Sequence, residues 1–396
     1  MDFRHIIFIS LLLLAMVGCR KSVVDVDPNL PTPVTLSATV AGSTGTKATI
    51  DGWNDTPVNI LGLKRVPGGY DFDDQTNILD REAVISADSQ IYLYSDNHAG
   101  TPYYYQEGQF YDFYGYHLGG AEVTEVLKGK DDYSLSVTVF GNNDLLYANT
   151  DKEKDLASYD GNALDKSVLY SAISARRNVH PVLRFSHALT RFKFIVKGSG
   201  DKFSLFAVSG LEVEAGNTGI LVLGDDYVGY MPSDQVSTLS LKMGDEEFQE
   251  SEITANIDAV PLGGDNASLM VNPGAKSMKV TMGLLQRSEN RHEEYSFVVN
   301  SSEIPLTDEN GRTYYSETFL PGYSYRIIMH VYGPEEIIIN ASVESWEIGA
   351  DFEINPDDYD SPVVNPQTPA GEAVGDGGIS VGDYDRTEDL GNGNLE

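Results

Sequence analysis

Cysteine is nearly absent from this chain of 396 residues, which contains a single one, Cys19. A disulfide within the chain is therefore impossible, and a metal site built from several cysteines is excluded. Basic residues are also scarce, since 27 Lys and Arg face 60 Asp and Glu and give a net charge of −33 at pH 7. A surface that binds nucleic acid needs clustered cations to displace the counterions of phosphate. We therefore expect no nucleic acid among the partners.

Long apolar runs are missing as well. The longest covers residues 6–17, too short for the helix of about 20 residues that spans a bilayer. It follows Arg4 and precedes Gly18, Cys19 and a polar stretch, which predicts a secretion signal over residues 1–18. A small residue directly before a cysteine resembles the lipobox of bacterial lipoproteins. That resemblance implies that Cys19 is acylated, with palmitate among the acyl chains, and becomes the first residue of the mature chain. An ordinary signal peptide with an incidental cysteine is the alternative.

Catalytic motifs are absent too. The chain lacks His-Glu-x-x-His, Gly-x-Ser-x-Gly, the Walker A loop and Gly-x-Gly-x-x-Gly. Ser199 and Lys202 fit Ser-x-x-Lys, but no companion motif accompanies them. No two histidines beyond the signal have the spacing of metal ligands, and the acids of residues 71–74 suit a solvated turn better than a calcium site. We predict no enzyme, cofactor or metal. A glycosidase pair of carboxylates stays open because so many acids are present.

What the sequence does contain is alternation. Residues 34–40 place Val34, Leu36, Ala38 and Val40 on one face, which predicts a half-buried strand. Further strands are expected at residues 58–63, 91–94, 110–116, 135–139, 191–196, 203–213, 220–223, 236–241, 278–285 and 295–299, with a hairpin formed by 325–332 and 337–346. Only residues 155–170 suggest a short helix or an irregular excursion. Short strands separated by turns indicate an all-β protein made of β-sandwiches.

The expected organisation has five parts. After the signal, residues 19–33 form a tether, 34–181 an N-terminal β-sandwich and 182–354 a second one. Residues 355–396 form an acidic tail containing Gly and Pro, with Arg386 as the only base. The tail is either a solvated segment or a donor of short apolar pieces to another subunit's sheet edge. These pieces are Val363-Val364, Ala373-Val374 and Ile379-Ser380-Val381.

Aromatic residues are concentrated between Tyr103 and Tyr116. An exposed cluster of this kind stacks on sugar rings, and it supports the alternative function of a surface lipoprotein that binds glycans. In strands, however, alternate aromatic side chains point into the core and the others form cross-strand pairs. We favour packing in the core.

Several segments of the chain together match the motifs of one known family. Residues 182–194, with Phe185, His187, Ala188 and Leu189, are similar to its Phe-x-His-Ala-Leu strand, and residues 144–148 to the Asp-Leu-Leu-x-Ala element before it. Residues 319–325 and 339–346 look like its last strands, and Thr46-Lys47-Ala48 with residues 53–63 like its beginning. The chain thus resembles fimbrillins, the lipoprotein subunits of type V pili. The resemblance covers residues 19 to about 351 and rests on the order and spacing of motifs.

The resemblance implies two tandem transthyretin-like β-sandwich domains and a structural role. Fimbrillins are exported to the outer membrane as lipoproteins, and a maturation protease removes the first strand so that a strand of the next subunit fills its place. Here the removed strand is residues 34–40 and the cleavage site Lys47, where the family usually has arginine. The expected function is therefore a fimbrial subunit that assembles with other subunits by donor-strand exchange at the cell surface and contributes to adhesion. Whether it is a shaft, tip or anchor subunit stays open.

Overall fold

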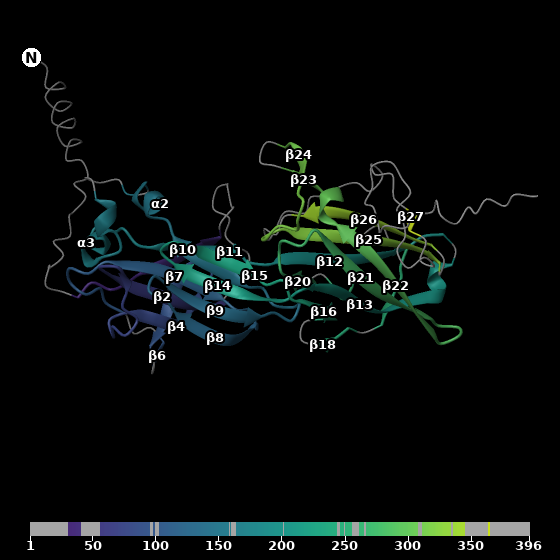
Figure 1. The fold of residues 1–396 in the computed structure, drawn as a ribbon, viewed down its shortest axis with the longest axis horizontal. Coiled ribbons are helices and arrows are strands. Elements are labelled where there is room, and N and C mark those ends of the chain that lie inside the picture. Colours follow the sequence, from purple (N-terminus) through teal and green to yellow (C-terminus); the bar gives the residue numbers. More distant parts are fainter. Residues whose placement is uncertain are drawn as a thin grey trace, which may run out of the picture.

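The computed structural model describes residues 31–40, 56–95, 98–99, 103–157, 159, 164–200, 202–243, 246–248, 250–255, 261–264, 267–307, 311–333, 336–344 and 363–364. Strands dominate these residues, which confirms the predicted all-β class. They form two lobes side by side along the long axis of the molecule, with most early strands in one lobe and most late strands in the other (Figure 1). Within the described part of the chain, no helix is long and apolar enough to cross a membrane.

The N-terminal lobe is built on a sheet that closes on itself. Its order is β1-β11-β10-β7-β2-β4-β5, and β1 also pairs with β5, which completes a ring; β6 continues from β5 and β3 from β2. The strands are β1 (Leu36–Val40), β2 (Thr56–Val66), β3 (Gly69–Tyr70), β4 (Ile78–Ile85), β5 (Gln90–Ser95), β6 (His98–Ala99), β7 (Tyr111–His117), β10 (Leu146–Thr150) and β11 (Val182–His187).

Each face of this sheet has its own core, because apolar residues occupy consecutive positions on its central strands. In β2, Ile60 belongs to the core inside the ring, whereas its neighbour Leu61 belongs to the core outside it. The outer core is covered by a second sheet in the order β15-β14-β9-β8. Its strands are β8 (Glu122–Lys128), β9 (Asp132–Thr138), β14 (Thr218–Gly224) and β15 (Val228–Pro232).

The C-terminal lobe is a sandwich of two sheets around a third core. One sheet has the order β20-β12-β25-β26-β27, and the other has the order β16-β13-β21-β22 with β19 on β13. The strands are β12 (Thr190–Gly198), β13 (Phe206–Gly216), β16 (Val236–Ser240), β19 (Ser251–Glu252), β20 (Leu269–Val271), β21 (Ser277–Gln286), β22 (Arg291–Asn300), β25 (Ser324–Gly333), β26 (Glu336–Glu344) and β27 (Val363–Val364). Two small hairpins, β17 (Lys242–Met243) with β18 (Glu246–Glu247) and β23 (Pro305–Thr307) with β24 (Thr313–Tyr315), complete it.

Helical turns are few and short. They are α2 (Lys152–Ala157), η1 (Lys166–Val168), α3 (Ala172–Ala175), η2 (Phe203–Leu205) and η3 (Ser301–Glu303). The stretch 155–170, in which a short helix was expected, contains the end of α2 and all of η1. Ser171 begins α3 with a reciprocal side-chain to backbone cap that it shares with Ser174.

The expected division at residues 181 and 182 lies just before β11. That strand pairs with β1 and β10 of the N-terminal lobe, and β14 pairs with β9 of the same lobe. The chain therefore enters the C-terminal lobe at β12, returns at β14 and β15, and leaves again at β16. Hydrophobic alternation identifies strands but contains no information about which sheet each strand joins.

Candidate functional site

The first strand occupies an unusual place between two neighbours of opposite direction. Residues 37–40 of β1 pair in parallel with residues 182–185 of β11, while Leu36 and Ser37 pair antiparallel with Ile91 and Gln90 of β5. The backbone N–H of Ala38 donates to the carbonyl of Ser89 at 2.9 Å, and that of Ser37 donates to Pro181 at 3.2 Å. β1 is thus the strand that closes the ring.

Side chains of β1 contribute to the core inside the ring. Leu36 and Ala38 are each 1% exposed and belong to the same core as Phe113 and Phe185, whereas Thr35 and Thr39 are exposed. The alternation predicted from the sequence for residues 34–40 is confirmed over these positions. Burial of two apolar side chains and pairing on both edges make β1 an integral part of the lobe.

The segment before β1 is also fixed to the lobe. The N–H of Val34 donates to the carbonyl of Tyr103 at 2.7 Å, and the N–H of Tyr105 donates to the carbonyl of Thr32 at 2.9 Å. Arg176 donates through Nε to the hydroxyl of Thr32 at 2.9 Å. Loss of β1 together with this segment leaves β11 and β5 with unpaired backbone groups and exposes an apolar slot between them, which is a costly state in water.

The aromatic cluster is mostly in the cores. Tyr105, Tyr111, Phe113, Tyr114 and Tyr116 are all buried, and only Tyr104 is well exposed, at 45%. Tyr105 lies edge-on to Tyr111 and Phe113 with ring centroids 5.7 and 6.2 Å apart. These rings therefore stabilise the N-terminal lobe and do not form a surface on which a sugar can stack.

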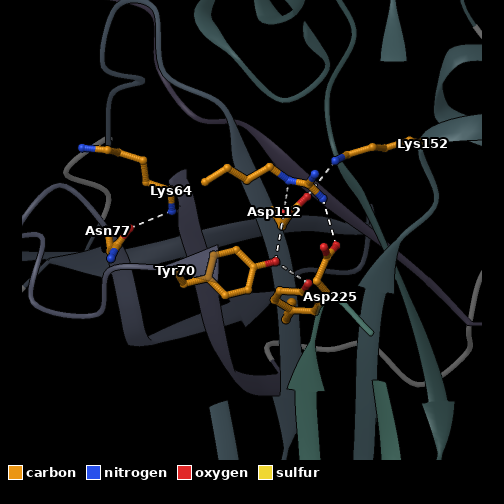
Figure 2. Close-up of polar contacts among 8 residues, drawn as sticks. Lys64, Tyr70, Asn77, Asp112, Lys152 and Asp225 are labelled. Atoms are coloured by element: carbon orange, nitrogen blue, oxygen red, sulfur yellow. Dashed lines mark hydrogen bonds and ion pairs between the residues drawn. The ribbon is translucent and has the colours of Figure 1, made fainter. Parts of the chain in front are cut away.

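A polar network surrounds Asp112, whose side chain is only 7% exposed. Its carboxylate accepts hydrogen bonds from Arg65 Nε, from the hydroxyl of Tyr70 at 2.9 Å and from Lys152 Nζ at 2.8 Å (Figure 2). Arg65 also donates through Nη2 to Asp225 at 3.0 Å, which joins the ring sheet to the turn between β14 and β15. Burial, and then the charge of Asp112, raise the pKa of Tyr70 far above its usual range.

Two residues of the motifs noted in the sequence meet at the end of the N-terminal lobe. Nδ1 of His187 lies 2.9 Å from a carboxylate oxygen of Asp144, and Leu146 pairs with His187 where β10 meets β11. The next residues, Ala188 and Leu189, are fully buried, and Thr190 begins β12. This contact fixes the point at which the chain crosses between the lobes.

The remaining predicted sites have different outcomes. Cys19 and Lys47 lie outside the described residues. Among the residues that are described, no group of three His, Cys, Asp or Glu side chains is arranged to hold a metal ion. In the turn at residues 71–74, Asp74 instead binds Lys64 and accepts from Thr76 at 2.9 Å.

Comparison with known proteins identifies the family of this chain. A family model described as fimbrillin-like matches residues 46–346. The chain belongs to the fimbrillin-like family. None of the curated proteins matches the sequence of this fimbrillin-like chain.

Three solved structures illustrate what the fimbrillin-like chain is similar to. One, proposed as a cell adhesion protein of Bacteroides uniformis, has 14% identity and a TM-score of 0.45, covering 79% of this chain and 98% of its own. A second proposed cell adhesion protein, from Bacteroides ovatus, has 11% identity and a TM-score of 0.47, covering 81% and 100%. The fimbrial anchor protein Mfa2 of Porphyromonas gingivalis has 9% identity and a TM-score of 0.36, covering 78% and 98%.

The Asp112 network was not anticipated from the sequence. Its only signal is an aspartate inside the aromatic strand Tyr111–His117, where an ionised group needs partners if it is buried. Its partners Arg65 and Lys152 lie 47 and 40 residues away along the chain, and Asp225 lies 160 residues from Arg65, which it binds. Pairs this distant carry no local pattern.

Proposed function

We propose that this chain is a structural fimbrial subunit that assembles by exchange of its first strand for a strand of another subunit. The observation that carries the proposal is the position of β1, which alone closes the ring between β5 and β11. The strand is short, and a parallel pairing such as that with β11 is slightly less stable per residue than an antiparallel one. Lys47, the proposed cleavage site, follows β1 by seven residues.

Once β1 is removed, a slot filled by another strand is more stable than a slot left empty. It presents backbone groups on two edges and apolar walls that include Phe113 and Phe185, both fully buried while β1 is in place. A strand of another subunit restores the hydrogen bonds and the burial at once. Because the chain has a charge of −33, attraction between subunits has to come from such short-range contacts.

The acidic tail supplies the donor strand in this proposal. The slot requires apolar side chains in the places of Leu36 and Ala38 and tolerates a small polar one in the place of Ser37. Ile379-Ser380-Val381 has this apolar, serine, apolar order. Val363 and Val364 are less suited, since they already pair with Ile338 and Ile337 at the edge of β26.

The tail is long enough to reach another molecule. Fourteen residues lie between Val364 and Ile379, and an extended chain spans about 3.3–3.6 Å per residue, which gives a reach of about 50 Å. In the same proposal, Cys19 is acylated during export to the outer membrane, where the lipid holds the precursor until a maturation protease cleaves at Lys47. Adhesion then follows from the finished fimbrium.

An engineered disulfide tests the tail as donor. Gln90 lies opposite Ser37 in the antiparallel pairing, so Gln90→Cys and Ser380→Cys should form an intermolecular disulfide if Ser380 takes the place of Ser37. Non-reducing gels of surface protein should show a ladder that disappears on reduction. The matched control combines Ser380→Cys with Glu82→Cys, which is exposed on β4. Equal ladders for both pairs, or none for either, would argue against the tail as donor.

A further inference from the structure

A hollow of about 460 Å³ lies at one end of the N-terminal lobe, within the size range of small-molecule sites. It exists because the second sheet ends at β15, which packs against β10, while the ring sheet continues past it to β11. The outward face of β11 and the end of β10 are therefore left uncovered: Ser186 is half-buried and Asn149 is exposed. The turn between β14 and β15 forms the opposite wall, with Asp225 and Val228.

The walls of the hollow have an unusual charge for this chain. Over the whole sequence acids outnumber bases by 60 to 27, but the hollow is lined by more bases than acids. The bases are Arg65, Lys152, Lys154 and Arg184, and the acids are Asp112, Asp151 and Asp225. Asp155, which binds Arg184, brings the number of acids to four as well, so a small anion that is repelled by most of the surface meets balanced charges here.

Carboxylates hold the bases in place and leave some of their N–H groups without a hydrogen-bond partner. Asp112 accepts from Nε of Arg65 and from Nζ of Lys152, and Asp225 accepts from Nη2 of Arg65 (Figure 2). The side chain of Arg184 is held in the same way, with Nη2 on Asp155 and Nη1 donating to the carbonyl of Val182 at 3.0 Å. Nη1 of Arg65 keeps no such partner among the described residues. Lys152 Nζ lies 5.6 Å from the ring centre of Tyr170 but binds no second carboxylate in the described part of the chain, so both groups can still donate to an acceptor in the hollow.

Uncharged hydrogen-bonding groups lie beside these bases. Asn149 is directly between Tyr114 and Arg184 in the register of β7, β10 and β11. Neither its carboxamide nor the hydroxyl of Ser186 has a side-chain partner in the described part of the protein. Carboxamides and hydroxyls both donate and accept, as is needed to bind hydroxyl groups.

We propose that this hollow binds a sugar acid, a small carboxylate with hydroxyl groups on neighbouring carbons. Lys152 and Arg65 bind the carboxylate through charge-assisted hydrogen bonds, while Asn149, Ser186 and Asp225 bind the hydroxyls. The site is distinct from the slot between β5 and β11 that β1 occupies, and it does not depend on strand exchange. It differs also from the aromatic surface considered from the sequence, because its specificity comes from paired charges rather than stacked rings.

Calorimetric titration of the purified full chain tests the proposal, with glucuronic acid as the probe and glucose as the neutral control. Glucuronic acid should bind about tenfold or more tightly than glucose, because a charge-assisted hydrogen bond is lost with the carboxylate. Methyl glucuronide distinguishes two sources: binding of both forms indicates the acidic end of a glycan, and binding of the free acid alone indicates a soluble sugar acid. No measurable binding, or equal binding of glucose, overturns the proposal.

Variants locate the binding in this hollow. Lys152→Met should weaken glucuronic acid about tenfold or more, whereas Lys279→Met, a matched control whose ammonium binds Glu214 on the C-terminal lobe, should leave it unchanged. If Lys152→Met does not fold, Asn149→Ala gives the same test at an exposed side chain and should weaken binding by several-fold. Unchanged affinity in the folded variants refutes the assignment of the site.

Discussion

Replacing Leu36 by alanine tests whether β1 belongs to the core of the N-terminal lobe. The side chain is 1% exposed and shares its core with Phe113 and Phe185, so the substitution removes buried apolar atoms and leaves a cavity. Such changes cost about 2–5 kcal/mol. Pairing of β1 with β11 and β5 on its two edges limits how far the surroundings can collapse into this cavity.

Urea unfolding followed by circular dichroism measures this loss, and Thr39→Ala is the matched control on the exposed face of the same strand. Leu36→Ala should lower the free energy of unfolding by about 2–5 kcal/mol, and the control should change it by less than about 0.5 kcal/mol. A loss in Leu36→Ala as small as that of the control would refute the placement of β1 in the ring.

Proteolytic cleavage provides a second test of the Leu36→Ala variant. After a lysine-specific protease cuts at Lys47, only non-covalent contacts retain β1. Each 1.4 kcal/mol changes an equilibrium tenfold, so the loss predicted for Leu36→Ala should release the strand segment at least about thirtyfold more readily than in the parent chain. Size-exclusion chromatography coupled to mass spectrometry detects the segment. Equal retention in both chains would contradict the buried position of Leu36.

Three further outcomes are expected. Asp112→Ala should lower the free energy of unfolding by about 2–3 kcal/mol, because it leaves buried donors without their acceptor. The cost is below that of a fully buried ion pair, since Arg65 is 44% exposed, and thermal or urea unfolding measures it. The hydrogen bond from Lys64, followed by those from Thr76, lowers the pKa of Asp74 to about 2 from 3.8, so its stabilisation is present above pH 4 and lost as the pH falls towards 2. Asp74→Asn should therefore remove part of the acid sensitivity in that window, and an unchanged pH profile would contradict the ion pair. Cys19→Ala should abolish incorporation of labelled palmitate, and retained label would exclude Cys19 as the acylated residue.

Local patterns predicted most of the strands. Phe192, Phe194 and Val196 face inward as their alternation indicates, at 0%, 1% and 9% exposure, and the hairpin of β25 with β26 forms where expected. In both cases the side-chain period of two and a nearby turn are sufficient information. The closed ring, by contrast, depends on pairing between residues 37–40 and 182–185, and nothing in either segment specifies a partner so far along the chain.

For the same reason, the sequence predicted only part of the candidate site. Alternation predicted a strand at residues 34–40, and the structure adds the two strands between which it lies. Its removal, which only the family resemblance implied, stays a prediction. The hollow next to Asp112 had no precursor in the sequence analysis. Its residues come from strands that meet only in the folded lobe, and the gathering of four bases that distinguishes it is invisible in a chain with a charge of −33.

The most direct test of the proposed assembly is mass spectrometry of the protein recovered from cell surfaces, combined with unheated SDS gels. If the first strand is exchanged, the mature chain begins at Ala48, β1 is missing from it, and the gels show a ladder of polymers that collapses on boiling. A chain that still begins at an acylated Cys19, with β1 present and no ladder, would contradict exchange of the first strand in this protein.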